Sequence, residues 1–162
     1  MENKRKIDEY IPKAINSLSN NRKIVKDGKI ASGFAGQIAT FSVAVSMGSL
    51  LSAVAFFSEQ KQASVERQEL MNVIYEIITG EVSEIKRETD NKDPKLLSYV
   101  KKKYEEKYEE TNKNKILEYR RFQEDILDAA IAVKLAINFF HKIEKEDKMD
   151  EWWLEKEIKR NG

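Results

Sequence analysis

The sequence predicts an all-α fold, a single-domain helical bundle of about five to six helices around a long, largely buried helix near the C-terminus. Apolar residues recur at helical spacing along most of the chain. Two prolines and six glycines are too few for the turns of a many-stranded fold. The length of 162 residues suits one domain with its own core.

The first helix is expected over residues 6–19, where apolar residues repeat at helical spacing between lysines. Asn20 and Asn21 should end it, and Asp27-Gly28 indicates a turn. The linker between the first helix and residue 30 is basic, and it carries Arg22, Lys23, Lys26 and Lys29. The total charge of +1 hides this local excess, because 29 basic residues nearly cancel 28 acidic ones.

Residues 30–58 carry no charge. The stretch exceeds the roughly 20 residues that a membrane-spanning helix needs, so a small single-span membrane protein is the main alternative. Serines, glycines and other small residues recur throughout it, which is typical of closely packed buried helices. We therefore expect two buried helices that meet near Gly48, since glycine is unfavourable inside a helix.

The next helix is expected to begin near Ser64, a favourable N-cap, and to end at Gly80 as its C′ residue. Residues 81–115 are rich in charge and form a charged helical insertion, with Asp93 and Pro94 at the start of a polar helix. Its apolar stripe is thin. A solvated helical excursion is the favoured interpretation over a partner-binding coil.

The long helix is expected over residues 115–142, and because it is apolar nearly all round it should be the central helix. Two residues stand out in it, Asp128 and Lys134. Asp128 has no base or nucleophile beside it, so a structural ion pair is favoured over a catalytic role. The tail, residues 145–162, contains Trp152 and Trp153, which either dock on the core or anchor a partner.

Composition argues against several kinds of chemistry. The chain has no cysteine and a single histidine, His141, so we expect no disulfide, no catalytic site, no metal site and no cofactor. No glycine-rich phosphate loop is present. A magnesium-dependent nuclease is the least favoured alternative, because no two carboxylates fall in an apolar setting where they would converge.

Three segments, taken in order, resemble the small-subunit family of the type III-B CRISPR (Cmr) RNA-guided effector complex. They are the opening IDEYIPKA, the glycine, serine and phenylalanine pattern of GQIATF followed by GSLL and AVAF, and the segment DAAIAVKLA of the long helix. Each is a packing pattern, so the resemblance lies in their order and spacing. The charged segment 81–115 is longer than in compact members of that family, and the tryptophan tail has no counterpart.

The resemblance implies a non-catalytic, cytoplasmic subunit that contributes to antiviral defence. Its copies would stack along the guide RNA and the target RNA, against the large subunit and the backbone subunits. It also implies that residues 30–58 are buried between helices and that no membrane is involved.

Cations spaced along an RNA backbone are what such a subunit needs. The linker supplies four of the candidate nucleic-acid-binding residues. The long helix supplies two more, Lys134 and Lys142. A lysine at position 134 is costly in an apolar helix unless its side chain reaches a groove. Lys142 should share a helical side with Lys134, Asn138 and His141. The complete set of candidates is Arg22, Lys23, Lys26, Lys29, Lys134 and Lys142.

Overall fold

A computed structural model describes residues 5–59, 65–81, 94–109 and 113–144. Within these ranges the chain forms six helices and three very short strands, which confirms the predicted all-α class. In chain order the elements are α1 (Ile7–Asn20), β1 (Val25–Lys26), β2 (Lys29–Ala31), α2 (Gly33–Met47), α3 (Leu50–Ser58), α4 (Gln68–Thr79), α5 (Lys95–Glu109), α6 (Lys113–Ile137) and β3 (His141–Ile143).

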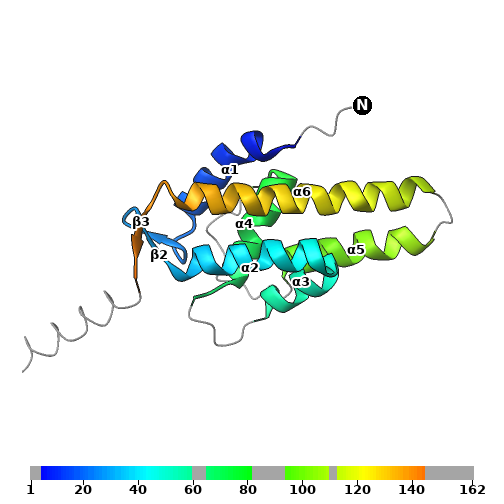
Figure 1. Cartoon of the computed structure of the whole chain (residues 1–162), viewed down its shortest axis with the longest axis horizontal. Coiled ribbons are helices and arrows are strands. Elements are labelled where there is room, and N and C mark those ends of the chain that lie inside the picture. Colours follow the sequence, from blue (N-terminus) through cyan, green and yellow to red (C-terminus); the bar gives the residue numbers. More distant parts are fainter. Residues whose placement is uncertain (1–4, 60–64, 82–93, 110–112, 145–162) are drawn as a thin grey trace, which may run out of the picture.

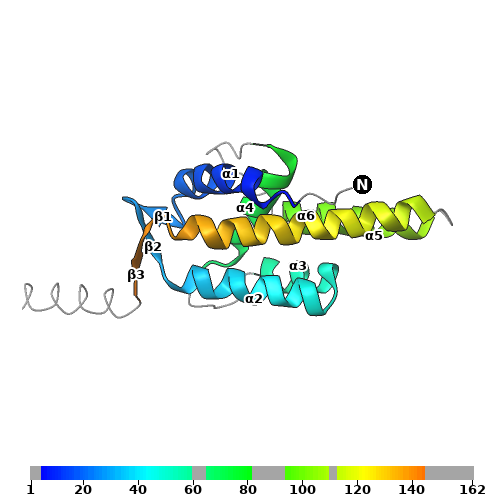
Figure 2. The ribbon, with the colours of Figure 1, turned by 45° about the horizontal axis from the view of Figure 1, so that its top comes forward.

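Helix α6 is the axis of the bundle. Figure 2 shows it between α1 on one side and α2 on the other, while α5 runs beside its first half (Figure 1). The three strands lie at one end of the molecule, and the connection from α5 to α6 lies at the other (Figure 1). The core consists of apolar side chains from all six helices and from the linker, among them Leu18, Ile30, Phe41, Phe57, Ile74, Leu96 and Ile126.

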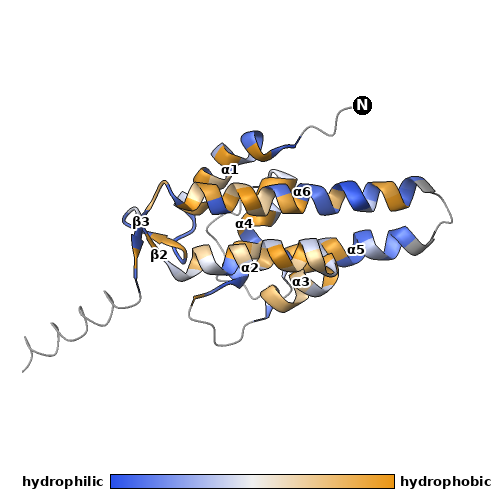
Figure 3. Ribbon diagram, in the orientation of Figure 1, coloured by the Kyte–Doolittle hydropathy of each residue, from blue (hydrophilic) through white to orange (hydrophobic). Residues whose placement is uncertain are grey.

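The long helix is shorter and less buried than predicted. It ends at Ile137, five residues before the expected end at residue 142. Its second half is apolar and buried, with Ala129, Val133 and Ala136 fully inaccessible to solvent. Its first half is mostly hydrophilic (Figure 3) and leaves Ile116 and Leu117 exposed, so the prediction of a largely buried helix holds only for the half that α1 and α2 cover.

The uncharged stretch forms two helices, as predicted. Helix α2 ends at Gly48, and a Cβ atom there would lie only 3.0 Å from the carbonyl oxygen of Ala44. Ser49 then caps α3, its Oγ accepting from the backbone N–H of Ser52 at 3.3 Å. With the stretch divided in this way, none of the helices in the described ranges is both long enough and apolar enough to cross a membrane.

The three-stranded sheet was not predicted. Asp27 and Gly28 form the expected turn, with φ values of 53° and 72°, and this two-residue turn joins β1 and β2 into an antiparallel hairpin. Strand β3 pairs in parallel with β2, and the backbone N–H of His141 donates to the carbonyl of Gly28 at 3.1 Å. Residues 141–143 are extended rather than helical, because their backbone groups form hydrogen bonds with the open edge of β2.

Helix α4 ends as predicted, with Gly80 in the left-handed conformation at φ 71°. It begins at Gln68 rather than near Ser64, which lies outside the described residues, as does Asp93 before α5. Helix α5 is the described part of the charged insertion 81–115. Its buried Leu96 and Val100 pack against the core, so it is docked as well as solvated. The tail, residues 145–162, lies outside the described ranges.

Candidate nucleic-acid interface

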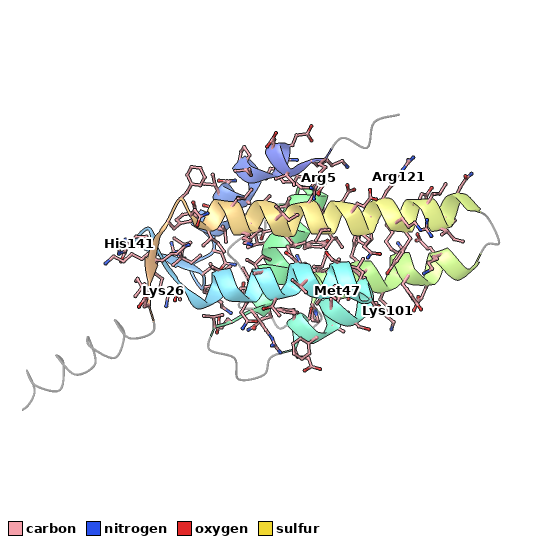
Figure 4. The ribbon with its side chains drawn as sticks, viewed as in Figure 1. Arg5, Lys26, Met47, Lys101, Arg121 and His141 are labelled. Carbon is pink, nitrogen blue, oxygen red and sulfur yellow. The ribbon has the colours of Figure 1, made fainter. Side chains whose placement is uncertain are left out.

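A row of three basic side chains crosses the small sheet. Lys26 of β1 lies directly opposite Lys29 of β2, and Lys29 lies directly opposite His141 of β3. Directly opposed residues project from the same face of a sheet, with Cβ atoms about 5 Å apart. We call Lys26, Lys29 and His141 the basic row. All three are exposed, and Figure 4 shows Lys26 and His141 at the same end of the molecule.

The basic row brings like charges together. Two lysines directly opposite each other destabilise a strand pair. Across the ranges that the structure describes, neither Lys26 nor Lys29 has a carboxylate within ion-pair distance. The neighbouring His141 adds an N–H donor even when its ring is neutral. Such a row is suited to an anion that bridges several cations, as a phosphate backbone does.

The other two linker residues are placed differently. Arg22 is exposed in the turn that follows α1, without a carboxylate at ion-pair distance among the described side chains. Lys23 is engaged, because its Nζ lies 3.5 Å from Oε1 of Glu69, a carboxylate only 13% exposed. Glu69 Oε2 also accepts from Nδ2 of Asn21 at 2.9 Å. Lys23 therefore helps to fix the linker to α4, and it is the weakest phosphate ligand of the predicted set.

The two C-terminal candidates lie near the basic row, although the predicted common helical side is wrong. His141 and Lys142 belong to β3, because α6 ends before them. Lys142 still lies beside Asn138, whose Oδ1 accepts from Lys142 Nζ at 2.9 Å. Lys134 is exposed in the last turn of α6, four residues before Asn138. The groove predicted for its side chain is unnecessary, because Lys134 faces solvent.

Asp128 has a structural role in the bundle. It is 7% exposed, and its Oδ2 accepts from the backbone N–H of Lys6 at 3.0 Å. Its Oδ1 lies 3.4 Å from Nε of Arg5. Lys6 occupies the N-cap position of α1 and makes no side-chain cap, while a carboxylate from α6 accepts from its backbone N–H near the positive end of the helix. The preference for a structural ion pair over a catalytic role agrees with this geometry.

The start of α1 carries mixed charges, with Asp8 and Glu9 beside Arg5 and Lys6. Burial, followed by the charges of Asp125, Asp128 and Glu9, raises the pKa of Tyr10 to about 12. Tyr10 therefore stays protonated in the folded protein at neutral pH. Asp125 and Asp128 lie within ion-pair distance of Lys6 and Arg5, so the charges at this end of α1 are largely paired, unlike those of the two lysines in the basic row.

Exposed positions of α2 and the start of α3 form a surface without charge. On α2 they repeat at helical spacing, and Val43 and Met47 are 56% and 84% exposed. We call the following exposed residues the neutral face: Gly36, Thr40, Val43, Ser46, Met47, Gly48, Ser49 and Ser52. Phe56 of α3 is also exposed, but it is not part of the neutral face, because the charged guanidinium of Arg67 stacks on its ring, 4.3 Å from the ring centroid. In a chain with 35% charged residues, an uncharged exposed surface of this extent is typical of a protein contact.

Among the described residues, no three histidine or acidic side chains converge as a set of metal ligands. The contribution of His141 to the site was missed from the sequence, because a three-residue strand leaves no periodic pattern. The turn residues Asp27 and Gly28, flanked by Val25-Lys26 and Lys29-Ile30, are a hairpin signal that places Lys26 opposite Lys29. The third strand, β3, has no comparable signal in the sequence.

Comparison of the chain with protein-family models, with curated proteins and with solved structures finds no match.

Proposed function

We propose that this chain is a non-catalytic small subunit of a type III-B CRISPR (Cmr) ribonucleoprotein complex, acting in cytoplasmic antiviral defence. The basic row is the observation that carries the RNA-binding part of the proposal. It presents two lysines and an imidazole from three strands on one face, and the lysines have no carboxylate partner in the described chain. Lys142 follows His141 but lies opposite the buried Ile30, so it belongs to the other face of the sheet, while Lys134 and Arg22 are exposed on neighbouring segments.

The assignment to this complex rests on the order of the three segments that resemble its small subunits. The architecture is compatible with it, since those segments fall on α1, on α2 with α3, and on the buried half of α6. The neutral face supports the other part of the proposed role, which is contact with neighbouring proteins in a complex. It offers protein neighbours, either further copies of the chain or the large and backbone subunits, a surface that can be buried without stranding a charge.

The test is the salt dependence of single-stranded RNA binding by the full chain and by the assembled complex. Replacing Lys26 and Lys29 together by alanine should weaken binding and flatten the plot of log affinity against log salt by about 0.7 per lost phosphate contact. Stability should be unchanged or slightly higher, because a like-charge pair is removed.

The matched control replaces Lys101 and Lys102 of α5 by alanine. These two lysines are exposed, and Figure 4 shows Lys101 far from Lys26. Because the control changes net charge equally, it separates a local contact from general attraction. An equal loss in both double variants, or no loss in either, would contradict a phosphate site at the basic row.

A further inference from the structure

Phe139 is exposed beside the basic row. It is 70% exposed, and of the large apolar side chains in the described chain only that of Met47 is more exposed. It lies in the turn between α6 and β3, two residues before His141. Two residues span at most about 7 Å, so the backbone of Phe139 lies close to that of His141, the β3 member of the row.

The turn that carries Phe139 is held by backbone hydrogen bonds. The N–H groups of Asn138, Phe139 and Phe140 donate to the carbonyls of Leu135, Ala136 and Ile137 at 3.0–3.2 Å. The next donor, His141 N–H, is fixed to Gly28 on the hairpin. Phe140 packs against the core while its neighbour Phe139 faces solvent. Exposure of Phe139 is therefore a property of an anchored turn.

A single exposed apolar residue is common and by itself indicates nothing. Here its backbone adjoins that of His141, and His141 lies opposite Lys29, which in turn lies opposite Lys26. An aromatic ring next to a cationic track is the combination that holds single-stranded nucleic acid, since cations bind the phosphates and the ring stacks on a base. A protein partner would be a poorer occupant, because it would bury unpaired lysines together with the ring.

We infer that Phe139 is a base-stacking residue for an unpaired nucleotide of single-stranded RNA whose phosphates lie on the basic row. The inference rests on the proposed function, because it requires RNA at this end of the molecule. It adds a binding residue and a ligand feature that charge alone does not predict, namely a preference for a backbone that carries bases.

The experiment compares two ligands of equal length and charge, a single-stranded oligoadenylate and the same ribose-phosphate backbone without bases. Phe139→Ala should weaken oligoadenylate binding by the full chain about 5- to 150-fold and leave binding of the abasic backbone unchanged. Phe139→Trp should retain base-dependent binding. Phe139→Leu, which keeps apolar bulk without a flat ring, should behave like the alanine variant.

Leu117→Ala is the matched control, since it removes an exposed apolar side chain from the opposite end of α6 and should change neither affinity. The stacking role would be overturned if Phe139→Ala changed the affinity for both ligands equally or for neither. It would also be overturned if Phe139→Leu bound oligoadenylate with the affinity of the wild type. The Lys26→Ala/Lys29→Ala variant tests the proposed function separately, because it should weaken both ligands. If the Lys26→Ala/Lys29→Ala variant binds both ligands as tightly as the wild type, the phosphate site is wrong, whatever the result for the Phe139 variants.

Discussion

Replacing Asp128 by alanine should lower the free energy of unfolding by about 2 to 3 kcal/mol, in the range expected for lost hydrogen bonds to a charged group. The change leaves the backbone N–H at the start of α1 without its acceptor and leaves Arg5 without its partner carboxylate. The measurement is urea denaturation followed by the helical circular dichroism signal, with the midpoint compared at constant slope.

Asp125 provides a matched control, because it is one turn away and also pairs with the start of α1. Its carboxylate is more exposed, at 29%, and contacts only the mobile end of a lysine side chain, Lys6 Nζ at 3.2 Å. Asp125→Ala should therefore cost at most about 1 kcal/mol. Asp128→Asn should fall between the two alanine variants, since an amide oxygen still accepts from Lys6. Equal losses for Asp125→Ala and Asp128→Ala would show that Asp128 does not cap α1.

Placing charge on the neutral face should impair incorporation of the chain into the proposed complex without unfolding it. In the double variant Val43→Glu/Met47→Glu both changed positions are largely exposed, so the isolated chain should lose less than about 0.5 kcal/mol per site. In a buried contact the same carboxylates would lie unpaired, and co-purification with the other subunits should fall about tenfold or more.

The control is Ile116→Glu/Leu117→Glu, which adds two carboxylates at exposed apolar positions near the start of α6. Incorporation of this control should match that of the wild type. The proposed protein contact would be wrong if the Val43 and Met47 variant assembled normally, or if the two double variants were impaired to the same extent while both remained folded.

Much of the bundle follows from patterns visible in the sequence. The apolar period of α1, the division of the uncharged stretch at Gly48 and the left-handed Gly80 after α4 each depend on interactions within a few residues. Local steric and hydrogen-bonding preferences decide such features, which is why they are predictable. The end of α6 is different. Residues 138–142 continue a plausible helix, and only the edge of β2, more than a hundred positions earlier, explains why they leave it.

The candidate site was predictable in its parts and not in its assembly. The linker lysines and Lys142 were identified from charge, but the sequence did not reveal that β3 lies beside the hairpin. That pairing places His141 next to Lys29 and brings the turn of Phe139 to the same end. Asp128 was expected to find a partner, yet its main one is the backbone N–H of Lys6, a group that every residue except proline carries and that no residue pattern marks.

Site-specific photocrosslinking within the assembled complex tests most directly whether the basic row meets RNA. A benzophenone side chain would be introduced singly in place of Phe139 near the row, the exposed Glu9 of α1, and Val43 on the neutral face. After irradiation, the share of labelled guide or target RNA attached covalently to the subunit would be measured. The account predicts RNA adducts from position 139, protein adducts from position 43 and no RNA adducts from position 9. RNA adducts from position 9 or 43, with none from position 139, would contradict it.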